Sequence, residues 1–293
     1  MITVKLKGGL GNQLFQYAFG RAVSLKLETP LMLDISMFEN QSETDIKRDF
    51  QLGCFNLHAT ISNSNTGSNI NFIKNGFDKI VNLIKSIANP YGGYIFEPKN
   101  LEVRDNSNLE GNWQSEKYFS DIETTLRHDL TLKEKLNPKA KLFKDRIKQV
   151  EDNGGVSTSI HIRRCDYITN KYSSAYHGVL DMTYYYKAIS ILQSKLCGKQ
   201  LVLFVFSDDI NWVKENLKTE VPYVCVSRPE IRDEEDMFLM SQCNHNIISN
   251  SSFSWWGAWL NSRKNKIVIA PKKWVKDPRA NTNDVTPLDW IKI

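Results

Sequence analysis

Residues 157–167, which read STSIHIRRCDY, decide the fold that the sequence predicts. The apolar alternation at the start predicts a strand that carries His161 and Arg163 on one face. Arg164 and Asp166 then fall at the carboxyl end of this strand, where open α/β sheets bind ligands. Two adjacent guanidinium groups favour a doubly charged anion such as a pyrophosphate, because each planar fork binds phosphate oxygens bidentately. The alternative is a solvated loop with a surface ion pair worth about 0–1 kcal/mol.

The composition is that of a soluble globular chain of about two domains, with 293 residues, 41% of them hydrophobic and 24% charged. The net charge of +5 suits anionic substrates or a membrane surface, but it falls short of a nucleic-acid-binding stripe. The five cysteines are widely spaced without a C-x-x-C pair, which predicts reduced thiols in the cytoplasm and no cysteine-based zinc site. No signal peptide and no apolar run of about 18 residues is found, so no membrane span is expected.

The N-terminal stretch reads as a strand over residues 2–6, a glycine-rich turn over 7–11 and a helix over 12–27. The glycines allow close backbone approach to a ligand, but they match neither the dinucleotide fingerprint nor a P-loop. Asn12 and Gln13 either cap the helix or present their amides to a ligand.

The remainder of the first half predicts a strand at 30–34, a polar loop at 62–71 and helices at 118–130 and 138–151. An amphipathic helix over 76–88 either packs in a core or docks a lipid-linked substrate, so the role of residues 62–95 stays open. Trp113, flanked by amides, suits sugar contact and plain packing equally well.

The second half alternates strands and helices, which predicts a Rossmann-like sheet. A domain hinge is expected at residues 152–155. The predicted strands are 201–206, 223–226, 246–248 and 266–270, and the predicted helices are 182–196, 212–217, 234–243 and one through 255–260.

Polar clusters at residues 163–166, 207–209 and 250–252 each follow a predicted strand, and together they suit a nucleotide. Arginines would neutralise its phosphates. Hydroxyl and N–H groups at a helix N-terminus would bind another phosphate oxygen, and an aspartate would accept hydrogen bonds from the edge of a guanine base. Ser207, Asp208 and Asp209 have two further interpretations, a Mg²⁺ or Mn²⁺ carboxylate pair and a helix cap.

Four motifs, in order along nearly the whole chain, resemble the bacterial α-1,2-fucosyltransferases of glycosyltransferase family 11. They are GGLGNQLFQY at 8–17, HIRRCDY at 161–167, FSDD at 206–209 and NSSFSWW at 250–256. Cys165 stands where glycine is commoner in that family. The resemblance implies an α/β, GT-B-like fold with two Rossmann-like domains facing a central cleft. Residues 1–152 would form the acceptor-side domain and 153–293 the GDP-fucose-binding domain, with the packing of the last helix on the N-terminal domain left open.

The resemblance also implies an inverting, metal-independent transfer of L-fucose from GDP-β-L-fucose to the 2-hydroxyl of a terminal β-galactoside. No cofactor is expected, and no metal. The setting would be O-antigen or other surface-glycan synthesis in the cytoplasm. Lipid linkage of the acceptor and peripheral attachment to the inner membrane are left open, and no nucleic-acid partner is expected.

By the same resemblance, Arg163, Arg164 and Asp166 hold the donor, with His161 in support. Arg164, with Arg163 nearby, would stabilise the charge on the departing phosphate. Asp166 is either the base for the acceptor hydroxyl or a carboxylate that orients an arginine. The other expected donor-site residues are Ser207, Asp208, Asn250, Ser251, Ser252 and Phe253, and the expected cleft residues of the N-terminal domain are Asn12, Gln13 and Trp113.

Three other functions compete with this one. A non-catalytic glycan- or nucleotide-binding module would bind GDP-fucose without releasing GDP, and a fucosyltransferase of another linkage would differ only in its product. A kinase-like enzyme is disfavoured, because the chain has neither a P-loop nor a kinase-type glycine loop.

Overall fold

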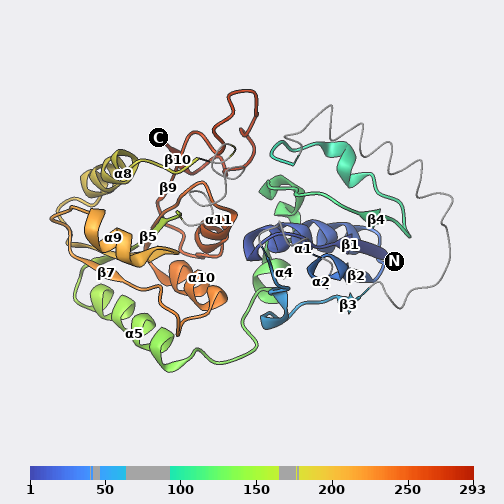
Figure 1. The fold of residues 1–293 in the computed structure, drawn as a ribbon, viewed down its shortest axis with the longest axis horizontal. Helices are drawn as coiled ribbons and strands as arrows, with labels where there is room; N and C mark the ends of the chain where they lie inside the picture. The colour runs from blue at the N-terminus through green and yellow to red at the C-terminus, as the bar shows by residue number, and fades with distance from the viewer. Residues whose placement is uncertain (40, 42–46, 64–92, 165–175, 177) are drawn as a thin grey trace. The chain divides into compact units, whose positions relative to one another are not determined.

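The computed structural model describes residues 1–39, 41, 47–63, 93–164, 176 and 178–293, which form two compact units (Figure 1). Unit 1 comprises Met1–Thr131 and Ala280–Val285, and unit 2 comprises Leu132–Arg279 and Thr286–Ile293. The predicted helix over 76–88 lies outside the described residues.

Unit 1 is built on a parallel sheet in the strand order β3-β2-β1-β4. Helix α1 (Leu10–Lys26) packs on β1 and β2, which alternate buried and half-buried side chains. The expected strand–turn–helix opening is therefore confirmed. The strands are β1 (Ile2–Lys5), β2 (Leu31–Asp34), β3 (Thr60–Ser62) and β4 (Asn108–Leu109); short helices are α2 (Ser36–Glu39), η1 (Leu52–Cys54) and η3 (Pro98–Leu101).

The N-terminus of α1 is stabilised by a distant residue. Gly9 occupies the cap position without a side-chain hydrogen bond, and the Leu10 N–H donates to Gln51 Oε1 at 3.0 Å. Gly8 has φ +78°, and a Cβ there would lie 2.7 Å from Asn12 Nδ2, so the turn requires glycine. The capping alternative for Asn12 and Gln13 is therefore wrong.

The helix predicted over 118–130 is broken into three pieces: η4 (Glu116–Tyr118), η5 (Ser120–Ile122) and α4 (Glu123–Asp129). The cause is packing of two adjacent buried rings against different partners. Tyr118 contacts Phe19 edge-on, with ring centroids 5.3 Å apart. The ring centroid of Phe119 lies 6.1 Å from that of Phe15. Only the last piece continues as α-helix.

Unit 2 is built on a second parallel sheet, in the order β10-β9-β8-β5-β6-β7. The chain adds β6 and β7 on one side of β5 and then β8, β9 and β10 on the other side. The topological switch point therefore lies between the carboxyl ends of β5 and β8. The strands are β5 (Val156–Ile162), β6 (Leu201–Ser207), β7 (Tyr223–Cys225), β8 (His245–Ile247), β9 (Val268–Ala270) and β10 (Ile291–Lys292).

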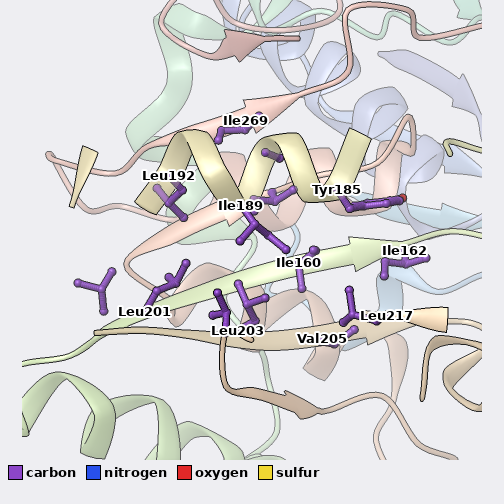
Figure 2. Packing of buried hydrophobic residues seen from close by; sticks show 14 of the residues in the cluster. Ile160, Ile162, Tyr185, Ile189, Leu192, Leu201, Leu203, Val205, Leu217 and Ile269 are labelled. Atoms are coloured by element: carbon purple, nitrogen blue, oxygen red, sulfur yellow. The ribbon is translucent and has the colours of Figure 1, made fainter. Parts of the chain in front are cut away.

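Alternate residues of the central strands feed two cores. Ile160, Leu203 and Val205 point to the face covered by α8 and α9, as Figure 2 shows for part of this cluster. Phe204 and Phe206 point to the opposite face, against α5 and α10. All the second-half helices and strands expected from sequence are confirmed within a few residues, and β10 is additional. The helices are α5 (Pro138–Asp152), α8 (Met182–Lys195), α9 (Ile210–Asn216), α10 (Asp233–Gln242) and α11 (Ser252–Trp259).

The division into units differs from the predicted boundary between residues 152 and 153. Helix α5 belongs to unit 2, because Phe143 and Ile147 share a core with Phe204 and Phe206. The last helix in the described chain, α11, also belongs to unit 2. A non-helical segment, Ala280–Val285, joins unit 1 instead.

Two further observations bear on the setting of the protein. Among the described helices, none combines the length and apolar character that a bilayer crossing requires. No disulfide joins the four cysteines that the structure describes, Cys54, Cys197, Cys225 and Cys243.

Candidate functional site

Arg163 and Arg164 follow directly on the central strand of unit 2, and Asp208 follows the neighbouring strand β6. The carboxylate of Asp208 bridges the two arginines. Its Oδ1 accepts a hydrogen bond from the backbone N–H of Arg164 at 2.8 Å, and its Oδ2 lies 3.3 Å from Nε of the Arg163 guanidinium. The parallel pairing of β5 and β6 places both strand ends at one edge of the sheet, as the sequence predicted.

The Arg164 guanidinium is held in a defined plane by Trp212. Its central carbon lies 3.4 Å from the centroid of the indole ring, a cation–π contact. Its Nε lies 3.6 Å from Asp209 Oδ2 and is buried without a hydrogen-bond partner among the described residues. Asp209 also caps α9 by accepting the Trp212 N–H at 3.1 Å, which confirms the helix-cap interpretation. Sequence reasoning missed Trp212, because a tryptophan at the start of a helix carried no signal beyond packing.

His161 lies at the end of β5, on the side of β8. Its Nδ1 is 2.8 Å from Ser249 Oγ, and its ring centroid is 5.6 Å from that of Phe253. Burial, with a smaller contribution from the charge of Arg163, lowers the pKa of His161 to about 3. The imidazole is therefore neutral at physiological pH, so it supports the strand ends without adding charge.

The segment after β8 leads into α11. Ser251 is the N-cap residue, and its carbonyl accepts the Ser254 hydroxyl at 3.2 Å. The Asn250 amide donates to the carbonyls of Gly178 and Trp274, both at 3.2 Å, which fixes this turn. Ser252 and Phe253 open the helix, where backbone N–H groups and the helix dipole favour an anion.

A buried carboxyl, Asp236 of α10, extends this edge toward β7, and sequence reasoning missed it. The Ser227 hydroxyl donates to Asp236 Oδ2 and accepts the Ser207 N–H at 3.1 Å. Asp236 Oδ1 is buried and has no hydrogen-bond partner among the described residues. Burial raises the pKa of Asp236 to about 7. Acidic residues at the start of a predicted helix are expected to be exposed and to favour its N-terminal dipole, so the sequence carries no signal that this one is buried.

The three candidate residues of unit 1, Asn12, Gln13 and Trp113, contact other residues of the same unit. Gln13 is fully buried and donates to the carbonyls of Gly8 and Asp49 at 2.8 and 2.9 Å. Asn12 accepts the Gln114 amide at 3.0 Å. Trp113 stacks on Phe19 with ring centroids 4.2 Å apart, and its side chain is buried in the core.

Asp166 and Cys165 lie outside the described residues. The structure therefore brings together Arg163, Arg164 and Asp208 at one point of the sheet edge. His161, Ser249 and Phe253 form a second contact group beside β8.

Comparison with known proteins places these motifs in context. The sequence pattern of Glycosyl transferase family 11 matches residues 1–293. The chain is 35% identical over 306 residues to the Escherichia coli O-antigen biosynthesis glycosyltransferase WbnK, with 98% of this chain and 99% of WbnK covered. It is 34% identical over 307 residues to an Escherichia coli alpha-1,2-colitosyltransferase, with 100% and 99% covered.

A solved structure supports the fold. The fucosyltransferase NodZ from Bradyrhizobium superposes with a TM-score of 0.52 over 87% of this chain and 92% of NodZ, at 12% identity. At that identity the likeness concerns the fold alone. The predicted α/β, GT-B-like architecture, with a separate parallel sheet in each unit, is confirmed.

Proposed function

Because the chain belongs to glycosyltransferase family 11, we propose that it transfers L-fucose from GDP-β-L-fucose to the 2-hydroxyl of a terminal β-galactoside, with inversion. The observation that carries this proposal is the pair Arg163 and Arg164 at the end of the central strand, held by Asp208 and Trp212. Guanidinium groups in a fixed orientation are suited to a diphosphate, because their N–H directions match its oxygens.

The reaction is a single displacement. The acceptor 2-oxygen forms a bond to C1 of fucose while the bond from C1 to the β-phosphate oxygen breaks, and the electron pair leaves with GDP. Arg164, with Arg163, stabilises the developing phosphate charge, and its fixed plane means that little reorganisation is required. The proton of the acceptor hydroxyl passes to a base, for which Asp166 remains the candidate.

Asp236 is our candidate for reading the guanine base. Its unpartnered Oδ1 is a hydrogen-bond acceptor beside the ends of β6 and β7, and a guanine edge presents two N–H donors. Such a ligand would satisfy the buried oxygen, which otherwise costs about 1–3 kcal/mol. This role replaces the less specific expectation that an aspartate of the strand ends reads the base.

We further propose that the transfer needs no metal ion. Asp208 and Asp209, the alternative Mg²⁺ pair, each lie beside an arginine, at 3.3 and 3.6 Å. Both oxygens of each carboxylate are already engaged, one by a backbone N–H and the other by an arginine, which disfavours a dication at the same point. The arginines supply the positive charge that a metal would otherwise bring to the leaving phosphate.

The relatives bear on the proposed acceptor and donor sugar. WbnK is named for O-antigen biosynthesis, which supports a surface-glycan acceptor, and we propose that this acceptor is lipid-linked during assembly. The colitosyltransferase gives a second candidate function, transfer of colitose. Colitose lacks the 3-hydroxyl of L-fucose, so the two donors share the nucleotide and differ at one sugar position.

The deciding experiment offers GDP-fucose and GDP-colitose separately, each with lactose as the β-galactoside and with EDTA present. We expect GDP release and an α-1,2-linked product with GDP-fucose, and neither with Arg164→Ala. Release with GDP-colitose alone would assign the second function. GDP-fucose binding without GDP release from either donor would instead indicate the binding module, and another linkage would correct the acceptor position.

A further inference from the structure

We propose that His58, His128 and Asp129 of unit 1 form a binding site for a divalent transition-metal ion, with Zn²⁺ as the ion it fits best. One ligand atom of each residue lies within 4.8 Å of the others. His58 Nε2 is 3.5 Å and His128 Nδ1 is 3.9 Å from the same oxygen, Asp129 Oδ1. These three residues belong to unit 1, whereas the arginine cluster of the proposed transfer belongs to unit 2.

The carboxylate of Asp129 is oriented by partners that engage its other oxygen. Oδ2 accepts the Tyr17 hydroxyl at 2.7 Å and Arg21 Nε at 2.9 Å, both from α1. The Asp129 side chain is only 1% exposed, whereas those of His58 and His128 are 58% and 77% exposed. A fixed buried carboxylate therefore presents one oxygen to two imidazoles that reach solvent, which gives an ion a route of entry.

The backbone on both sides of the site is also held. The His58 N–H donates to the Tyr17 hydroxyl at 3.1 Å, so one hydroxyl links this histidine to Asp129. The His128 carbonyl accepts the Thr131 N–H at 3.2 Å and the Thr131 hydroxyl at 2.8 Å. These contacts fix the backbone at both histidines, so only the side-chain torsions of the two imidazoles remain to be adjusted around an ion.

The donor set matches zinc chemistry. Imidazole nitrogens and a carboxylate oxygen bind Zn²⁺ at about 2.0–2.2 Å, so tetrahedral ligands lie about 3.4 Å apart. The two exposed imidazoles would rotate to bring their nitrogens to that spacing, and water would take the fourth position. Zn²⁺ stands above Fe²⁺ and Mn²⁺ in affinity for such N/O sites, and Cu²⁺, which binds them more tightly, prefers a square-planar rather than a tetrahedral arrangement. The ion would tie the chain after η1 to the end of α4, which predicts stabilisation of the fold.

The test titrates untagged, chelator-treated full-length protein with ZnCl₂ in a calorimeter, and follows thermal unfolding with and without the ion. We expect saturable binding of one ion per chain and a rise in Tm. His58→Gln and His128→Gln should each weaken binding by at least about tenfold and remove the rise in Tm. Both histidines are exposed, so these variants should fold.

Glu123→Gln on the same helix, which removes an exposed charge paired with Arg127 at 2.8 Å, is the control and should bind Zn²⁺ as the wild type does. Co²⁺ should give the absorption bands of a four-coordinate site in the wild type and not in the histidine variants. Absence of saturable Zn²⁺ binding would overturn the assignment. Equal affinity in the wild type and both histidine variants would do the same, because the ion would then bind elsewhere.

Discussion

Replacing Asp236 by asparagine should make unit 2 more stable at alkaline pH while weakening the binding of GDP. The carboxyl is buried, and its pKa is raised from 3.8 to about 7, mainly by loss of solvation. The charges of Asp233 and Glu235 raise the pKa further, whereas the Ser227 hydrogen bond and the charge of Arg228 lower it. Asparagine keeps an oxygen for Ser227 and carries no charge.

The size of the effect follows from proton linkage. The folded-state pKa lies above the unfolded value, so the folded protein binds the proton more tightly. The resulting stabilisation is complete below about pH 3.8 and is lost as pH rises through about 7. Each pH unit inside this window changes the unfolding free energy by about 1.4 kcal/mol. From about pH 5 to about pH 8, the wild type should therefore lose about 3 kcal/mol through this group.

Urea unfolding of wild type and Asp236→Asn at both pH values measures this difference, because groups common to both proteins cancel. We expect the variant to gain about 2–3 kcal/mol on the wild type between about pH 5 and about pH 8. GDP affinity should fall at least about tenfold, since the amide presents an N–H to the guanine donors. A stability difference that does not change with pH would refute the buried-carboxyl argument, and unchanged GDP affinity would refute the base-reading role.

Three other substitutions test the site and its support. Trp212→Leu should lower kcat/KM for the donor about 3- to 30-fold by removing the stack on Arg164, with thermal unfolding as the check that the fold persists; unchanged kcat/KM would count against the positioning role. Gly257→Ala should destabilise unit 2 by about 1–2 kcal/mol in urea unfolding, because the new Cβ would lie 2.9 Å from Met240 Cβ; equal stability would show that α10 and α11 separate easily. Asp166→Asn should abolish the acidic limb of the pH–rate profile if this residue is the base, and an unchanged profile would remove it from that role.

The sequence predicted the parts of the site that depend on strand ends. Alternating and continuous apolar runs located β5 and β6, and parallel pairing then required Arg164 and Asp208 to meet. The cap role of Asp209 also followed from its position before a helix. The strands and the cap depend on residues near one another in sequence, where periodicity and turn chemistry give direct signals, and the rule of parallel pairing then brings the strand ends together.

The remainder depends on contacts between distant residues. Gln51, not a neighbour, accepts the Leu10 N–H at the start of α1. The burial of Asp236 arises from packing of α10 against α11, α5 and β5, which no local pattern of acidic residues reveals. His58 and His128 are far apart in the chain, so no ligand spacing indicated them.

The most direct measurement is calorimetric titration of GDP into the wild type and Arg164→Ala, with Arg263→Ala as the matched control. Arg263 pairs with Glu151 at 2.7 Å, and Glu151 also accepts a hydrogen bond from Ser157 at the start of β5. The control therefore removes an arginine near the amino end of β5, whereas Arg164 follows its carboxyl end. Loss of charge-assisted hydrogen bonds should weaken GDP binding about 10- to 150-fold in Arg164→Ala and leave Arg263→Ala unchanged. Equal GDP affinity in all three proteins would contradict a diphosphate site at the end of β5.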